Sequence, residues 1–282
     1  MKIRHIVLLL SAACLLCGCG KTEQPENPYR LKQTTVEYYY RDRETFTWEF
    51  VDTYDENGWL VENQEFENGI ADTKTLYEHD AYGNITRTTQ IHPDGTRDVG
   101  EDILTLDKKH RVIYSESTWN GEPSATTQYG YNDDGQITQL YINRIDVRDG
   151  EDWKSFVDRT YDPKGRLTRE DTRWEPDNNN TSYTLYHYEQ DRLLRTETYK
   201  EEELDTYTDY TYDESGLVQT AVSFDANGVK ESKYITTFDE YGNELEVISY
   251  FYASERMRYG ETDEEPDRRT TYVYESKNHS NP

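Results

Sequence analysis

One short motif recurs along this 282-residue chain and limits what it can fold into. The motif reads aromatic, acid, any, any, Gly, polar, aliphatic, and its clearest copy occupies residues 161–167. Copies begin at positions 54, 79, 106, 131, 161, 188, 212 and 238, so successive copies are 24 to 30 residues apart. Self-similarity at such a period indicates a repeat architecture in which each repeat is one supersecondary unit.

The motif has the composition of a tight hairpin turn. An Asp that accepts backbone hydrogen bonds, two further residues and then a Gly describe a type I turn closed by a left-handed residue. His110 replaces the glycine in the third copy, and Asp191 lies in the shortened sixth copy; both residue types tolerate positive φ. Structural turns are therefore assigned to the fifth motif position at Gly58, Gly83, Gly135, Gly165, Gly216 and Gly242.

The residues before each motif alternate between aromatic and polar, as at Trp48, Phe50 and Tyr54. This period of two predicts half-buried strands. A second set of turn signals lies midway between the motifs, so each repeat of about 26 residues is predicted to contain two strands and two turns. These signals occupy residues 68–69, 94–95, 120–121, 149–150, 177–180 and 227–228.

Composition favours a thin β structure over a thick globular core. Only 33% of the residues are hydrophobic, 31% are charged and the mean hydropathy is -1.08, which leaves few aliphatic side chains to bury. Aromatic residues, at 13%, supply strand formers with a large buried area. We expect an all-β fold of tandem antiparallel hairpins over residues 36–275, forming an extended, curled single-layer or solenoid-like sheet.

Residues 159–167, which read Arg-Thr-Tyr-Asp-Pro-Lys-Gly-Arg-Leu, closely resemble the unit of the YD-repeat (Rhs-like) family. The resemblance extends over roughly residues 36–275 and implies long antiparallel sheets that curl or spiral, in surface or secreted proteins. The repeat spacing is longer than the family's usual unit, and the large core segment and the C-terminal toxin are missing. The resemblance therefore implies an architecture and not toxin encapsulation, and eight units are expected to be too few for a closed shell.

Residues 1–18 read as a lipoprotein signal peptide, with a positive start and an apolar stretch. Residues 16–19, Leu-Cys-Gly-Cys, resemble a lipobox, so we expect cleavage between Gly18 and Cys19 and a diacylglycerol on Cys19. Cys14 is a weaker acceptor, and an ordinary signal peptide is the alternative. The chain is thus expected in the bacterial cell envelope, lipid-anchored and extracytoplasmic, with a polar tether over residues 19–35 and a polar tail over residues 276–282.

The charge of the chain limits its binding partners, and its cysteine content limits the disulfides that it can form. The chain has 57 acidic and 31 basic residues, a net charge of -26, and such a surface repels nucleic acid. All three cysteines lie within the first nineteen residues, so no disulfide is expected in the repeats.

No catalytic residue, cofactor or metal site is predicted from the sequence. The six histidines have no metal-ligand spacing, and no nucleophile or phosphate-loop motif is present. Residues 55–58 and 225–228 resemble half of an EF-hand loop, but the flanking ligand positions of that loop are not met. Hairpin turns are the preferred interpretation of both segments.

Two classes of function remain open. The first is a non-catalytic binding or scaffold module for a glycan or protein ligand, and the second is a carbohydrate-active or other enzyme, or an accessory subunit, with a carboxylate site that the sequence does not reveal. Trp119, Trp153 and Trp174 are the candidate ligand aromatics, because no stacking rule requires them, whereas motif tyrosines such as Tyr161 should pack between strands. An outer-membrane barrel is rejected, because segments such as residues 118–129 lack alternating apolar residues.

Overall fold

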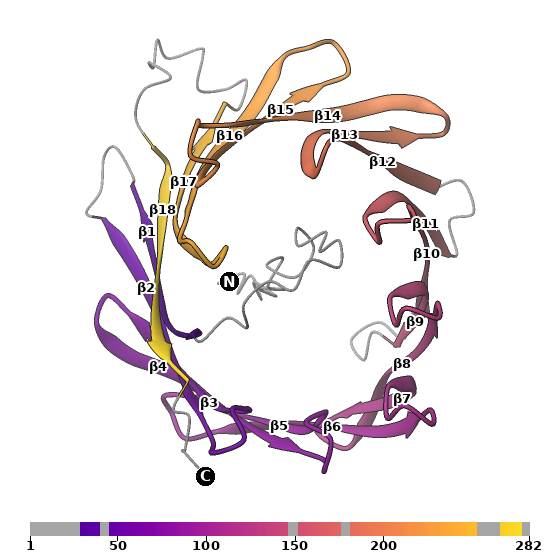
Figure 1. Ribbon diagram of the computed structural model, residues 1–282. Coiled ribbons are helices and arrows are strands. Elements are labelled where there is room, and N and C mark those ends of the chain that lie inside the picture. Colours follow the sequence, from indigo (N-terminus) through magenta and orange to yellow (C-terminus); the bar gives the residue numbers. More distant parts are fainter. Residues whose placement is uncertain (1–28, 40–44, 146–151, 176–180, 253–265, 278–282) are drawn as a thin grey trace.

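A computed structural model describes residues 29–39, 45–145, 152–175, 181–252 and 266–277, which form one antiparallel sheet of eighteen strands. Each strand pairs with its neighbours in chain order, and β1 also pairs with β18, so the sheet closes into a barrel (Figure 1). Within these ranges, no helix has the length and apolar character needed to cross a membrane. The strands are β1 (Tyr29–Tyr38), β2 (Phe46–Tyr54), β3 (Leu60–Glu67), β4 (Ile70–His79), β5 (Ile85–Ile91), β6 (Arg97–Leu106), β7 (Val112–Trp119), β8 (Glu122–Tyr131), β9 (Ile137–Ile145), β10 (Asp152–Tyr161), β11 (Leu167–Glu175), β12 (Thr181–Glu189), β13 (Arg192–Lys200), β14 (Glu203–Tyr212), β15 (Val218–Asp225), β16 (Lys230–Phe238), β17 (Glu244–Phe251) and β18 (Arg268–Ser276).

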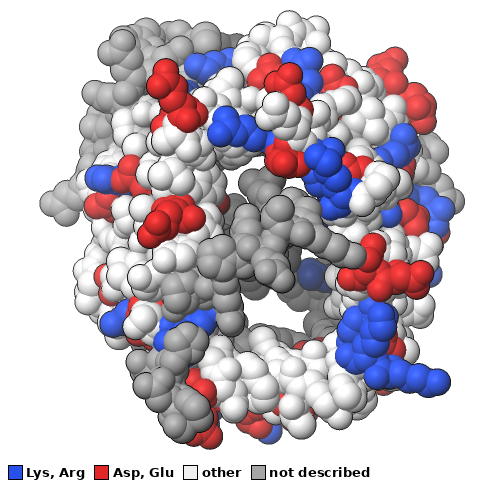
Figure 2. Space-filling model, viewed as in Figure 1, with Lys and Arg blue, Asp and Glu red and all other residues white. Residues whose placement is uncertain are grey.

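The closed barrel contradicts the extended, curled sheet that we expected from the sequence. The structure is all-β and built of antiparallel hairpins, but an open, curled or solenoid-like sheet is wrong, and so is the expectation that the units are too few to close. With strands about 4.8 Å apart and tilted by about 40°, eighteen strands enclose a ring about 35 Å across between backbones. Side chains cannot fill a ring of this width, and Figure 2 shows openings inside the ring.

The first strand begins earlier than expected. Residues 29–35, assigned to the tether from the sequence, are the first part of β1; they pair with β18, and from Gln33 onward also with β2. The signal peptide, Gly18 and Cys19 lie outside the described residues, as does most of the predicted tail.

The motif turns have the backbone geometry that the Asp-x-x-Gly pattern describes. In the fifth copy, Asp162 accepts hydrogen bonds from the backbone N–H groups of Lys164 (2.9 Å) and Arg166 (3.0 Å), and Gly165 has a φ of 82°. His110 has a φ of 61°, whereas in the sixth copy it is Gln190, not Asp191, that has a positive φ, of 52°. The remaining motif glycines have φ values between 75° and 90°, at Gly58, Gly83, Gly135, Gly216 and Gly242.

A β-bulge accompanies the motif turn. The first motif residue pairs with the last, as Tyr161 does with Leu167, and the register shifts by one residue beside this pair. Thr168, the extra residue, donates a side-chain hydrogen bond to the carbonyl of Thr160. The seventh copy is the exception, because Tyr212 pairs with Gln219 and no shift occurs. Bulges bend a strand, and in Figure 1 the turns that join β6 to β7, β8 to β9 and β10 to β11 curl toward the middle of the ring.

The second set of turns lies at the opposite end of the barrel. Asn68-Gly69 and Asn120-Gly121 form two-residue hairpin turns in which both residues have positive φ. Residues 201–202, Glu-Glu, form the same turn with φ values of 49° and 67°, and this turn was missed in the sequence because it contains no Gly or Asn. The predicted turns at residues 149–150 and 177–180 lie outside the described residues.

The barrel closes through a ninth repeat whose two halves come from the two ends of the chain. Tyr274 on β18 pairs with Leu31 on β1, and the register shifts beside this pair, as it does beside the aromatic–aliphatic pair of a motif copy. Glu275 follows Tyr274 as an acid follows the motif aromatic, and it forms an ion pair with Arg30 at 2.9 Å. We call residues 274–275 and 30–31 the split repeat.

Candidate functional site

The strand register assigns every strand residue to one of two faces, because side chains alternate and directly paired residues share a face. All strand residues that are buried fall on the same face. Side chains crowd together on the concave side of a closed sheet, so this face lines the lumen. The buried strand residues are Val36, Thr75, Ser115, Ser155, Leu167, Leu193, Gln219, Ser232, Thr236, Ser249 and Thr270.

The outer face carries charged side chains in ion pairs at the middle of the strands. Arg195 lies 2.7 Å from Asp209, and Lys74 lies 2.8 Å from Glu62. Further pairs on this face join Arg87 to Glu78 and Glu101, Arg169 to Asp171, and Arg269 to Glu246. A charged group on a lipid-facing strand costs about 2–4 kcal/mol at the bilayer midplane, so this outer wall is suited to water.

The luminal wall consists largely of tyrosine, serine and threonine. Burial raises the pKa of the luminal tyrosines, to about 12 for Tyr54 and for Tyr274, so their hydroxyl groups stay neutral at physiological pH. The same cause raises the pKa of Tyr77, Tyr129, Tyr131, Tyr161, Tyr186, Tyr188, Tyr210 and Tyr272. The wall can therefore both donate and accept hydrogen bonds to a polar ligand.

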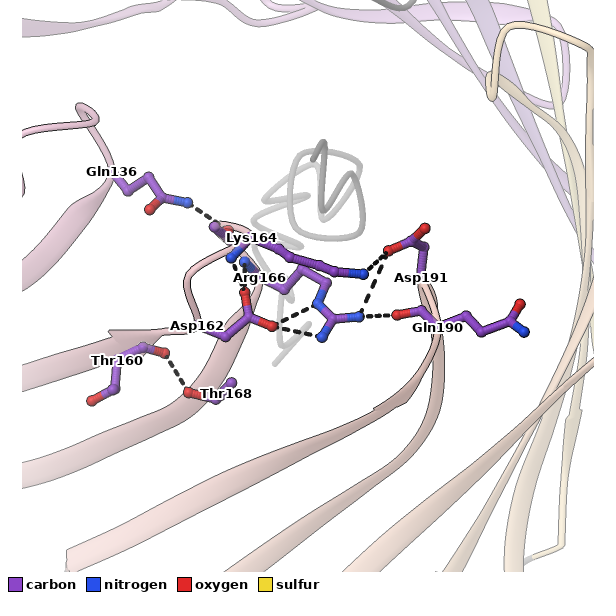
Figure 3. A network of polar contacts seen from close by, with 9 residues as sticks. Gln136, Thr160, Asp162, Lys164, Arg166, Thr168, Gln190 and Asp191 are labelled. Atoms are coloured by element: carbon purple, nitrogen blue, oxygen red, sulfur yellow. Dashed lines mark hydrogen bonds and ion pairs between the residues drawn. The ribbon is translucent and has the colours of Figure 1, made fainter. Parts of the chain in front are cut away.

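Contacts between successive motif turns stiffen one end of the barrel (Figure 3). Gln136, from the fourth copy, donates a 2.6 Å hydrogen bond to the carbonyl of Gly165 in the fifth. Lys164 and Arg166 of the fifth copy reach forward to the sixth, where Lys164 lies 2.9 Å from Asp191 and Arg166 donates to the carbonyl of Gln190. We call this series of linked turns the turn ring.

Arginine–aspartate pairs hold two of the motif turns. Arg111 donates side-chain and backbone hydrogen bonds to Asp107, which lower the pKa of that carboxyl group to about 2. At Asp162, partial burial opposes the shift, but hydrogen bonds from Arg166 and Lys164 still lower the pKa. The turn ring is thus a structural element in which hydrogen bonds hold the motif carboxylates.

The motif tyrosines link neighbouring repeats. Tyr161 donates a 2.8 Å hydrogen bond to the carbonyl of Ile137 in the preceding repeat, and Tyr131 does the same to Val112 at 2.7 Å. In several copies an arginine stands just before the motif aliphatic residue and lies over the next motif tyrosine, with Arg111 4.3 Å from the ring centre of Tyr131. The same cation–π contact joins Arg166 to Tyr188, Arg192 to Tyr212 and, through the split repeat, Arg30 to Tyr54.

Trp119, Trp153 and Trp174 all lie on the luminal face, toward the end opposite the turn ring. Trp174 is paired with buried Ser155 on the adjacent strand, and Trp153 is 39% exposed. Trp119 is paired with Gly100, where an added Cβ would lie 3.1 Å from the indole, so this ring lies flat against β6. The structure therefore places the three tryptophans along one arc of the lumen, from β7 to β11, which we call the tryptophan arc.

Two acidic side chains on another part of the luminal wall have pKa values raised by burial. Burial raises the pKa of Asp52 on β2, although a hydrogen bond from Asn63 (2.8 Å) opposes the shift. Burial also raises the pKa of Glu65 on β3, with a smaller contribution from Asp72. Asp52 and Glu65 lie on adjacent strands, and the sequence gave no reason to select them among 57 acids.

Histidine and acidic groups do not assemble a metal site in the part of the chain that the structure describes. His92 lies 2.8 Å from Asp98, which also accepts a 2.8 Å hydrogen bond from Asn120. Residues 55–58 and 225–228 form hairpin turns in which Asp55 and Asp225 accept backbone hydrogen bonds.

Comparisons with known proteins show no family. No protein-family profile and no curated protein matches the sequence. Similar solved structures include a porin-like protein from Bacteroides uniformis, which is 14% identical, with 87% of this chain and 96% of that chain covered and a TM-score of 0.42. Another is TcdB2-TccC3-TEV, at 12% identity and a TM-score of 0.23, with 84% of this chain and 19% of that chain covered. TcdB2-TccC3 without its hypervariable C-terminal region is also 12% identical, with 77% and 18% covered and a TM-score of 0.23.

Proposed function

We propose that this chain is a lipid-anchored envelope protein whose water-facing barrel binds a glycan in its lumen, without catalysis. The observation that carries the proposal is the tryptophan arc. Trp119, Trp153 and Trp174 come from three strands, share the luminal face and lie near one end of the barrel. Indole rings offer large flat apolar surfaces with a polar N–H group, which suits a ligand that has both apolar and polar edges.

The rest of the lumen supports a polar ligand. Neutral tyrosine hydroxyls and Ser and Thr side chains line the wall. Sites that bind small ligands combine aromatic surface with a few placed polar groups. A protein ligand is the other outcome of a binding screen, and relationship to the YD-repeat family stays a prediction.

The outer face and the N-terminus support the proposed location. Ion pairs such as Arg195–Asp209 favour an exterior in water, so the proposed membrane contact is made by a diacylglycerol on Cys19 and not by the barrel wall. In Figure 2, basic and acidic side chains are interspersed around the visible face of the ring, as expected for a solvated surface.

The experiment is a glycan-array screen of the full-length chain, purified in detergent, against a variant with Trp153→Ala and Trp174→Ala. We expect the wild-type chain to bind a restricted set of glycans and the variant to lose at least 10-fold in affinity with little change in melting temperature. Tyr199→Ala is the control, because Tyr199 stacks on Tyr183 on the outer face, with ring centres 4.8 Å apart, and should mainly affect stability. Equal glycan binding by the wild type and the double variant would contradict the proposal.

A second candidate is a carbohydrate-active enzyme that uses Asp52 and Glu65. Their raised pKa values and luminal position favour it, because a general acid needs a carboxyl group that stays protonated. The test is release of reducing ends from any glycan found on the array, with Asp52→Asn and Glu65→Gln as variants. Hydrolysis that both variants abolish would favour the enzyme over the binding module.

A further inference from the structure

Arg144 and Trp153 face each other across the pairing of β9 with β10. They are directly paired, both lie on the luminal face, and the guanidinium carbon lies 5.6 Å from the indole ring centre. Both side chains are exposed to solvent, Trp153 at 39%. The pair therefore presents a cation beside an aromatic surface to the lumen.

In the part of the chain that the structure describes, Arg144 is the arginine that lies over a tryptophan ring. Like Arg173, Arg192 and Arg268, it differs from five other arginines over aromatic rings that are neutralised by a carboxylate. Among the described residues, no carboxylate lies within ion-pair distance of Arg144, whereas Arg166 lies 2.6 Å from Asp162 and Arg195 lies 2.7 Å from Asp209. The same neutralisation applies to Arg30, Arg111 and Arg169. In a chain with a net charge of -26, a luminal arginine with no carboxylate beside it among the described residues has guanidinium donors to offer to a ligand.

Trp174 extends the aromatic surface. It is paired with Ser155, two residues along β10 from Trp153, so the two tryptophans are diagonal neighbours on one face. Diagonal neighbours on a sheet are about 7–8 Å apart, which is within the span of two linked sugar rings. Arg144 stands at the β9 side of this surface.

We propose that Arg144, Trp153 and Trp174 form a subsite for a carboxylated sugar, and this inference rests on the proposed glycan-binding function. The sugar ring stacks on an indole, and its carboxylate accepts two hydrogen bonds from the guanidinium of Arg144. Bidentate contact of this kind is specific for planar anions. Long-range electrostatic attraction does not assist the binding of an acidic sugar, because the net charge of the chain is negative. The subsite selects acidic sugars by direct contact alone.

The test uses pairs of probes that differ in the carboxylate. Trigalacturonic acid is compared with its methyl ester, and sialyllactose with lactose, by calorimetric titration of the full-length chain in detergent. We expect at least one acid to bind about 10-fold or more tightly than its neutral counterpart, because charge-assisted hydrogen bonds are lost in the neutral form. Arg144→Gln should remove this preference, and Trp153→Ala should weaken both members of the pair.

Arg173→Gln is the matched control. Arg173 lies 4.2 Å over the ring of Phe156 and also has no carboxylate at ion-pair distance among the described residues, but it lies on the outer face. This variant should keep the preference for the acid. If neither acid is preferred, or if Arg144→Gln leaves the preference intact, the acidic-sugar subsite is wrong. Binding of neutral glycans that depends on the tryptophans would then still support the proposed function, whereas failure of all glycans would contradict both.

Discussion

Arg30 and Glu275, which are 245 positions apart in the chain, form an ion pair of 2.9 Å at the point where the barrel closes. Arg30 also lies 4.6 Å over the ring of Tyr54. Arg30→Ala should lower the free energy of unfolding by about 1–2 kcal/mol, the sum of a partly buried ion pair and a cation–π contact. Denaturant titration measures the loss, and hydrogen exchange should increase first in β1 and β18. Equal increases in all strands would contradict a specific role in closure.

Tyr161 tests the link between repeats. Tyr161→Phe removes the hydrogen bond to the carbonyl of Ile137 and should cost about 0.5–1.5 kcal/mol, whereas Tyr161→Ala also removes the ring and should cost about 2–3 kcal/mol. Chemical denaturation measures both changes. Tyr114→Phe is the control, because the Tyr114 hydroxyl donates a hydrogen bond to Glu116 on an exposed part of the outer face. If Tyr161→Ala is silent, the motif tyrosines do not carry the packing assigned to them.

Gly165 tests the turn. With a φ of 82°, a β-branched residue is strained there, so Gly165→Val should cost on the order of 1–3 kcal/mol. His110→Gly relieves a positive φ of 61° but removes a ring stack with Tyr82 at 4.0 Å, so the two effects should nearly cancel. Thermal melts of both variants check these results. A silent Gly165→Val would contradict the turn assignment.

Glu244 predicts a dependence of stability on pH. It stands where other motif copies have an aliphatic residue, and burial raises the pKa of its carboxyl group, although a hydrogen bond with Tyr272 opposes the shift. A pKa raised by folding means that the folded state binds the proton more tightly than the unfolded state, so this contribution to stability is lost as the pH rises through the folded pKa. Tyr272 and Tyr274 are titratable groups that interact with Glu244.

Glu244→Leu should therefore stabilise the barrel at neutral pH and flatten the loss of stability above the usual range of glutamate pKa values. Melting temperatures between pH 4 and 8 measure the change, with Glu240→Gln on the exposed turn as the control. The β17–β18 ladder has four paired positions against nine for β1–β18, so the gain should appear as slower hydrogen exchange at this seam. An unchanged pH profile would show that Glu244 is not the group responsible.

Cys19→Ala tests the anchor. Loss of the acceptor thiol should abolish acylation and release or misprocess the protein, which mass spectrometry and cell fractionation would detect. Cys14→Ala is the matched control and should leave lipid attachment unchanged. Acyl chains found on Cys14 instead of Cys19 would reject the assignment.

The sequence predicts the geometry of the motif turns, but it does not predict that β1 and β18 pair to close the barrel. The Asp-x-x-Gly pattern identifies turns such as 162–165 because Asp accepts backbone hydrogen bonds and Gly takes a positive φ, both of which depend on a few neighbouring residues. Closure depends instead on Arg30 and Leu31 matching Tyr274 and Glu275 across the whole chain. No turn joins the two halves of the split repeat, so a search for the continuous motif does not detect them.

The candidate site, too, was predictable from the sequence only in part. Trp119, Trp153 and Trp174 were selectable because they break the repeat, but only the register shows that they share the luminal face. Arg144 carries no sequence signal, because an arginine near a turn is ordinary in a chain with 31 basic residues. Its importance comes from the lack of a described carboxylate beside it and from its pairing with Trp153.

The split repeat makes the order of the repeats around the barrel independent of where the chain starts. Tyr29 and Ser276 are paired, so a short Asp-x-x-Gly linker between β18 and β1 would turn the ninth repeat into a continuous one. New ends could then be opened at any motif turn, such as residues 162–165. The barrel is in this sense circularly permutable, and the proposed lipid anchor could be moved to any of nine positions around the rim without altering the lumen.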